Sequence, residues 1–238
     1  MYSTKAGGIN RDALKIIAVI TMLVDHIGAV LFKDITVLRI IGRLSFPIFA
    51  FMVAEGCSYT KNKAKYLFNL VLFGCIAQVM KVYFNQGGKL NIMFTFALSA
   101  VMVFALDKAV KVIKNDSSPQ KQIYLSVLFI LTVSVVWLVC TIFTVDYGFW
   151  GCMTPLITSA AFYIESDYFD RNKLKTILLA FALSLVYMKY GGVQIYAFAA
   201  LIPLWFYNGQ KGGNVPKYFF YIFYPVHLAV LYAIDIFI

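Results

Sequence analysis

Long, continuous apolar runs divide this chain, and they constrain its fold more than any other feature. Crossing about 30 Å of hydrocarbon takes roughly 20 helical residues. Runs of that order recur at residues 13–32, 40–58, 66–84, 91–113, 122–144, 148–164, 173–189, 193–208 and 218–237. They predict about nine transmembrane helices, joined by loops too short for a second domain. We therefore expect residues 1–238 to form one all-α, polytopic integral membrane helix bundle.

The composition also indicates a membrane protein. Apolar residues make up 61% of the 238 residues and charged residues only 13%, whereas soluble domains carry about 45–50% and about 25%. Such a chain cannot cover itself with a polar surface, which excludes the soluble and disordered classes. The four cysteines form no close pair of metal-ligand spacing, so we expect no metal site. The first apolar run lacks a small-residue cleavage pattern and is expected to remain as a helix.

Membrane topology explains the net charge of +10 without any binding of nucleic acid. Lys and Arg gather in alternate loops, and the richer set of loops belongs in the cytoplasm. That set holds Lys5, Arg11, Lys15, Lys61, Lys63, Lys65, Lys108, Lys111, Lys114, Lys121, Arg171, Lys173, Lys175, Lys211 and Lys217. The other set holds Lys33, Arg39, Arg43, Lys81, Lys89 and Lys189. We expect a multi-pass protein of the cell inner membrane with its N-terminus in the cytoplasm.

Two ionisable residues, Asp25 and His26, lie side by side inside the first apolar run. Inserting a charged side chain at the bilayer centre costs about 2.5–3.5 kcal/mol even on the scale that gives the lowest cost. Each such residue therefore needs a neutralising partner or has a function. Counted from the cytoplasmic end, His26 lies somewhat past the midplane. It is a candidate general base or nucleophile, and Asp25 is placed to raise its basicity or fix its tautomer. The alternative is a structural polar contact between helices.

The second run carries Arg43 near the depth of His26 and Glu55 near the cytoplasmic end. We expect Arg43 to neutralise Asp25; the alternative is that it extends to the outer headgroups. Glu55 follows Arg43 by 12 residues, and the resulting separation of about 18 Å along a helix is too large for a direct pair.

A basic cluster of Lys61, Lys63 and Lys65 lies close to Glu55 at the cytoplasmic side. Together these residues are a candidate site for the phosphates of a nucleotide-bearing cofactor. Retention of positive charge in the cytoplasm explains the lysines equally well.

Polar residues of other runs reach the same depth as His26. Gln78 and His227 are both expected near the midplane. His227 follows Tyr224 and Pro225, and the proline bends a helix and frees a carbonyl group. A core histidine is the alternative interpretation of His227.

These residues together resemble the TraX family, polytopic proteins named for the N-acetylation of conjugative F-type pilin. The resemblance runs essentially end to end. It is carried by Asp25-His26, by Leu38-Arg39-Ile40-Ile41-Gly42-Arg43-Leu44-Ser45-Phe46-Pro47-Ile48-Phe49-Ala50-Phe51 with Glu55-Gly56, by Leu90-Asn91-Ile92 with Thr95, by Gln194 with Tyr196-Ala197, by Tyr207-Asn208-Gly209, and by Phe223-Tyr224-Pro225-Val226-His227. The histidine followed by Arg-x-x-x-Pro-x-Phe-x-Phe also looks like the broader group of transmembrane acyltransferases.

The resemblance implies acetyl transfer from cytoplasmic acetyl-CoA, with His26 as the catalytic histidine beside Asp25 and Arg43. Direct attack by an amine or hydroxyl acceptor is favoured over an acetylated His26. The acceptor stays open between a pilin-like membrane peptide, a sugar and a small amine. The candidate donors to the thioester oxyanion and contacts to substrate are Arg43, Gln78, Asn91, His227 and Tyr224.

Two other functions fit the same residues. A proton-coupled transporter would use Asp25, His26, Arg43 and His227 as a polar pathway. A non-catalytic membrane assembly factor would tolerate neutral isosteres at Asp25 and His26. Acetyl transfer predicts instead that changing His26 abolishes turnover while the protein still folds.

Overall fold

The computed structural model of the chain is an all-α bundle. It describes residues 7–115, 118–166, 168–213, 215–216 and 218–237. Over these residues the regular structure is helical, apart from two isolated parallel bridges, Ile9–Tyr207 and Leu90–Val145. Lys5 and Lys217, counted above among the cytoplasmic charges, lie outside the described residues.

Each expected apolar run coincides with a helical segment. The α-helices are α1 (Arg11–Val30), α2 (Thr36–Gly42), α3 (Ser45–Tyr59), α4 (Lys63–Tyr83), α5 (Ile92–Asn115), α6 (Pro119–Ile142), α7 (Gly148–Ser159), α8 (Arg171–Tyr190), α9 (Leu201–Trp205) and α10 (Phe219–Phe237), and the 3₁₀ helices are η1 (Ala160–Phe162) and η2 (Gly192–Ala200).

Five segments of the described chain are long and apolar enough to cross a membrane. They are Arg11–Val30, Thr36–Tyr59, Lys63–Tyr83, Pro119–Ile142 and Phe219–Phe237. The expected number of nine is not reached by this criterion. One reason is length, since α7 has 12 residues and a straight crossing takes roughly 20.

The second apolar run is broken rather than continuous. The expected helix over 40–58 is interrupted at Arg43 and Leu44, between α2 and α3. Pro47 lies in the first turn of α3, where its missing N–H leaves no intrahelical hydrogen bond unmade. Inside a continuous helix the same proline would remove a hydrogen bond and clash with the preceding turn, so the helix starts again just before it.

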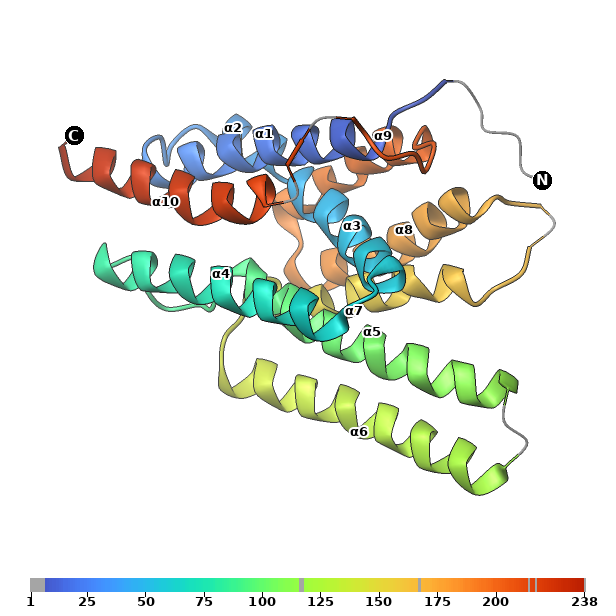
Figure 1. The fold of residues 1–238 in the computed structure, drawn as a ribbon. Coiled ribbons are helices and arrows are strands. Elements are labelled where there is room, and N and C mark those ends of the chain that lie inside the picture. Colours follow the sequence, from blue (N-terminus) through green and yellow to red (C-terminus); the bar gives the residue numbers. More distant parts are fainter. Residues whose placement is uncertain (1–6, 116–117, 167, 214, 217, 238) are drawn as a thin grey trace.

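Helices α1, α3, α5, α4 and α10 surround a common interior. Each packs against the next in that order, and α10 closes the ring against α1. In Figure 1, α1 and α10 lie above α4, and α3 crosses between them. Helix α6 packs on the outside of this ring, against α5 and α7, and most of its apolar side chains are exposed. An exposed apolar helix of this length is typical of a lipid-facing segment.

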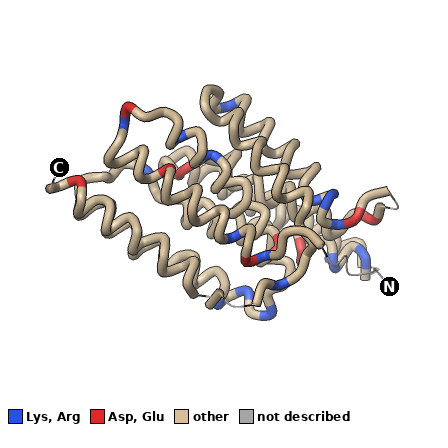
Figure 2. The backbone as a smooth tube through the Cα atoms, turned by 90° about the horizontal axis from the view of Figure 1, so that it is seen from above, with Lys and Arg blue, Asp and Glu red and all other residues tan. Residues whose placement is uncertain are grey.

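The ends of the bundle differ in charge. The N- and C-termini lie at opposite ends (Figure 1). In Figure 2, most of the Lys and Arg positions lie in the half of the bundle that holds the N-terminus. This asymmetry is the one on which the expected orientation rests.

A buried carboxylate, Glu55 of α3, joins three distant parts of the chain at the N-terminal end. Its Oε2 accepts hydrogen bonds from Arg11 Nε at 3.1 Å and from the Tyr207 hydroxyl at 2.8 Å. Its Oε1 accepts from Lys175 Nζ at 2.9 Å. Lys175 was expected among loop charges, but it is fully buried, and its ammonium lies 4.6 Å from the centre of the Phe51 ring. One carboxylate thus fixes α1, α3 and α8 relative to one another.

Replacing Glu55 by Gln is expected to destabilise the fold strongly. The change leaves the ammonium of Lys175 buried without its counter-charge, and breaking a buried pair in this way costs about 3–5 kcal/mol. Thermal unfolding of the purified protein in detergent measures the loss. The double variant Glu55→Gln/Lys175→Met removes both charges and should recover part of the melting temperature, whereas an unchanged melting curve for Glu55→Gln alone would refute a stabilising role.

Candidate active site

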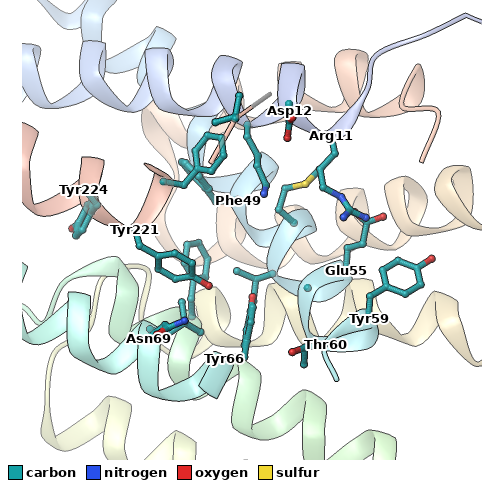
Figure 3. A pocket seen from close by; sticks show the side chains of 18 of the residues that line it. Arg11, Asp12, Phe49, Glu55, Tyr59, Thr60, Tyr66, Asn69, Tyr221 and Tyr224 are labelled. Carbon is teal, nitrogen blue, oxygen red and sulfur yellow. The ribbon is translucent and has the colours of Figure 1, made fainter. Parts of the chain in front are cut away.

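The ring of helices borders an open cavity of about 740 Å³, within the range of about 300–1,000 Å³ usual for small-molecule sites. Figure 3 shows Arg11, Asp12 and Glu55 near one part of it and Tyr221 and Tyr224 near another. Cationic side chains line the cavity at the N-terminal end of the bundle. They are Arg11, Lys15, Lys61, Lys65 and Lys211.

A second cavity, of about 250 Å³, adjoins the first. Both cavities are lined by Met22, Phe49, Ile92, Phe96 and Tyr224, which we call the collar. Polar side chains surround the rest of the smaller cavity. They are Asp25, His26, Arg39, Arg43, Ser45, Lys81, Asp146 and Tyr147. The collar therefore lies between the larger cavity, with its basic side chains, and the smaller cavity, which His26 lines.

Asp25 is neutralised by two arginines. Its Oδ1 accepts a hydrogen bond from Arg43 Nη2, and its Oδ2 lies 2.9 Å from Arg39 Nη1. Arg43 is almost completely buried, and its Nε donates to the Arg39 carbonyl at 3.1 Å. The expected pair of Asp25 and Arg43 is confirmed, and extension of Arg43 to the headgroups is wrong. Arg39 is a second partner that the sequence analysis did not identify.

His26 contacts His227 rather than Asp25, whose carboxylate oxygens are held by the two arginines. His26 Nδ1 lies 2.9 Å from His227 Nε2, across 201 residues of sequence. His227 Nδ1 lies 2.7 Å from the carbonyl oxygen of Phe223. His26 lines the smaller cavity and His227 does not, so a molecule bound in this cavity would contact the imidazole of His26. The group placed to fix its tautomer is therefore His227 rather than Asp25.

The loop before α7 contributes two residues that the sequence analysis missed, Asp146 and Tyr147. Tyr147 adopts a left-handed backbone conformation with φ of 59°, its ring stacks on Phe46 at 3.9 Å, and its hydroxyl accepts a hydrogen bond from Arg43 Nη1 at 3.3 Å. Burial raises the pKa of Tyr147 to about 12. Burial also raises the pKa of the Asp146 carboxyl, against the opposing effect of Lys81. The only signal in the sequence is a polar Asp-Tyr-Gly segment between two apolar runs.

Gln78 and Asn91 bind each other and line neither cavity. Gln78 Oε1 accepts hydrogen bonds from Asn91 N at 3.1 Å and from Asn91 Nδ2 at 3.0 Å. Asn91 Nδ2 also donates to the Gly74 carbonyl at 2.8 Å, and Gln78 Nε2 donates to the Lys89 carbonyl at 3.3 Å. These bonds attach the start of α5 to α4. The structure therefore does not bring Gln78 and Asn91 together with His26.

The three lysines of the basic cluster separate. Lys61 and Lys65 line the larger cavity, but Lys63 forms an ion pair with Asp107 of α5 at 2.6 Å. Asn62 caps α4 by accepting a hydrogen bond from Lys65 N at 2.8 Å. Residues two apart on a helix point about 200° away from each other, so Lys63 and Lys65 face different neighbours.

Replacing Gly42 by Ala is expected to disrupt the contact between Asp25 and the arginines. A Cβ at Gly42 would overlap the Asp25 side chain. Overpacking of this kind costs about 1–3 kcal/mol, although alanine is the better helix former by about 1 kcal/mol. Thermal unfolding should show a lower melting temperature for Gly42→Ala. Gly87→Ala is the control, because nothing lies within 4 Å of a Cβ there; equal melting curves for both variants would contradict the contact.

Comparison with known proteins places the chain in a family. The family model described as TraX protein matches residues 10–235. The chain is 29% identical to the probable fimbrial assembly protein FimC, serogroup H1, of Dichelobacter nodosus, over 94% of this chain and 95% of that protein. It is 34% identical to the uncharacterized protein RP591 of Rickettsia prowazekii (strain Madrid E), over 40% of this chain and 36% of that protein. No solved structure matches. Because the family match extends over nearly the whole sequence, the chain belongs to the TraX family.

Proposed function

We propose that this protein is a membrane-embedded acetyltransferase that moves an acetyl group from cytoplasmic acetyl-CoA to an amine or hydroxyl acceptor. The proposal is supported by the pair of adjoining cavities, with five cationic side chains lining one and His26 lining the other. The acceptor would be a pilin-like membrane peptide, a sugar or a small amine. The protein would lie in the cell inner membrane with its N-terminus in the cytoplasm, and the nine apolar segments would all contribute to the bundle.

The larger cavity suits the donor. Acetyl-CoA carries its phosphate groups at the nucleotide end. A long, narrow arm extends from that end and terminates in the acetyl thioester. Lys and Arg side chains bind phosphates by charge-assisted hydrogen bonds, and five of them line this cavity at one end of the bundle. With the phosphates there, the thioester arm would extend inward between apolar and aromatic side chains. Its acetyl end would then reach the collar beside His26.

The proposed reaction is a direct transfer from the thioester to the acceptor, without an acetylated enzyme. His26 takes a proton from the acceptor N–H or O–H as the acceptor atom bonds to the thioester carbonyl carbon. The tetrahedral intermediate collapses with cleavage of the C–S bond, and the departing thiolate receives the proton from His26. Tyr224 lies in the collar with its ring centre 6.2 Å from that of His26, so its hydroxyl is a candidate donor to the oxyanion.

His26→Gln is expected to abolish turnover without unfolding the protein. Loss of a general base slows catalysis by about 10²–10⁴-fold, whereas glutamine keeps a polar side chain of similar length beside His227. The assay incubates purified protein in detergent with radiolabelled acetyl-CoA, a panel of amines, sugars and membrane extract, and measures free coenzyme and labelled acceptor. Melting curves recorded in parallel control for folding. Wild-type turnover in His26→Gln would overturn the assignment of the base.

Removing cavity lysines is expected to weaken binding of the donor rather than the chemical step. Lys61→Gln, Lys65→Gln and Lys211→Gln should each raise the KM for acetyl-CoA several-fold and leave kcat nearly unchanged, and added salt should reduce the difference. Lys63→Gln is the matched control, because Lys63 pairs with Asp107 and does not line the cavity. An equal rise in KM for Lys63→Gln would show that general surface charge, rather than this cavity, attracts the donor.

A second candidate function is a non-catalytic role in pilus assembly. It is favoured by the description of the relative from Dichelobacter nodosus as a probable fimbrial assembly protein. This function predicts no release of coenzyme with any acceptor, and it predicts that His26→Gln still supports assembly. The assay above therefore separates the two functions.

A further inference from the structure

We infer that His227 is a positioning residue that holds His26 as its Nδ1–H tautomer, with the Nε2 lone pair of His26 directed to reacting groups. The catalytic consequence rests on the proposed function. The tautomer itself rests only on hydrogen-bond geometry. Each has its own test below.

The Phe223 carbonyl fixes the proton of His227. A carbonyl oxygen only accepts hydrogen bonds, and His227 Nδ1 lies 2.7 Å from it. The proton of His227 is therefore on Nδ1. In a neutral imidazole the other nitrogen is then an acceptor, so His227 Nε2 presents a lone pair.

His26 Nδ1 lies 2.9 Å from His227 Nε2. Because His227 Nε2 presents a lone pair, His26 Nδ1 is the donor. Nε2 of a neutral His26 consequently carries no proton. That nitrogen is the one able to act as a base, and His26 lines the cavity in which the acceptor would bind.

The surroundings favour two neutral rings. Among the described residues, no carboxylate lies within 4.0 Å of either imidazole as an ion-pair partner. Asp25, the nearest acid in sequence, is held by two arginines. A positive charge on His227 would be buried without a counter-charge, which is costly inside a membrane protein. Two Nδ1–H tautomers in a row satisfy both hydrogen bonds with neutral rings.

His227 is itself held in place. Its ring stacks on Phe223 with centres 4.9 Å apart and planes 17° apart, and its side chain is almost completely buried. When His26 takes a proton on Nε2, its Nδ1–H becomes a charge-assisted donor to His227, and that bond strengthens. His227 thus stabilises the protonated base without receiving the proton.

Nitrogen NMR tests the tautomers without any assay of activity. The chain contains only two histidines, so protein labelled with ¹⁵N-histidine in detergent gives signals from these two rings alone. At neutral pH we expect both rings as Nδ1–H tautomers, with a nitrogen–nitrogen coupling across the bond from His26 to His227. A proton on Nε2 of His26, or a cationic ring at either position, would overturn the inference.

Two variants test the catalytic consequence. His227→Leu removes the acceptor and should lower kcat by between about 10-fold and 10⁴-fold, the range found for partners that orient a catalytic group. The KM for acetyl-CoA should not change. His227→Gln retains a carbonyl oxygen as acceptor and should recover much of the rate. Equal kcat for His227→Leu and wild type would overturn the positioning role.

Failure of the inference is distinguishable from failure of the proposed function. If no variant and no acceptor gives turnover but NMR shows both Nδ1–H tautomers, acetyl transfer is wrong and the histidine pair stands. If His26→Gln is inactive but His227→Leu retains full kcat, acetyl transfer stands and the positioning role is wrong.

Discussion

The structure depends on how an apolar bundle accommodates buried charge. Two of its inward-facing carboxylates are each held between two cationic side chains: Asp25 between two arginines, and Glu55 between an arginine and a lysine. An unpaired charge in either place would be too costly for the fold. These ion pairs connect segments far apart in the sequence, and so they determine how α1, α2, α3 and α8 can be placed.

The same two groups of charges lie beside the cavities. Glu55 lines the larger cavity and Asp25 the smaller one. Five cationic and two acidic side chains line the larger cavity, and three cationic and two acidic side chains line the smaller one, so both carry excess positive charge. Such cavities favour an anionic substrate with its reactive end toward the collar. The charges that stabilise the bundle thereby also favour the donor that we propose.

The helices and the need to neutralise a buried charge could be predicted from the sequence, because each depends on residues close together in the chain. Run length located the helices, and the cost of burying Asp25 predicted its pair with Arg43. Contacts across long separations were not readable. Nothing in the sequence near Glu55 indicates Lys175, 120 residues away. Similar depth in the membrane predicted that His227 lies near His26, and the two side chains are in contact. The same prediction was wrong for Gln78, which binds Asn91 instead. Depth does not determine which way a side chain points around its helix.

A structure with a bound donor analogue would locate the donor relative to His26. Electron cryomicroscopy of the protein with a thioether analogue of acetyl-CoA, which cannot transfer its acyl group, would show where each end lies. We expect the phosphates beside Lys61 and Lys65, and the acyl carbonyl at the collar, about 3–4 Å from the space that an acceptor bound to His26 Nε2 would occupy. An analogue bound elsewhere, or with its acyl end directed away from His26, would contradict acetyl transfer at His26.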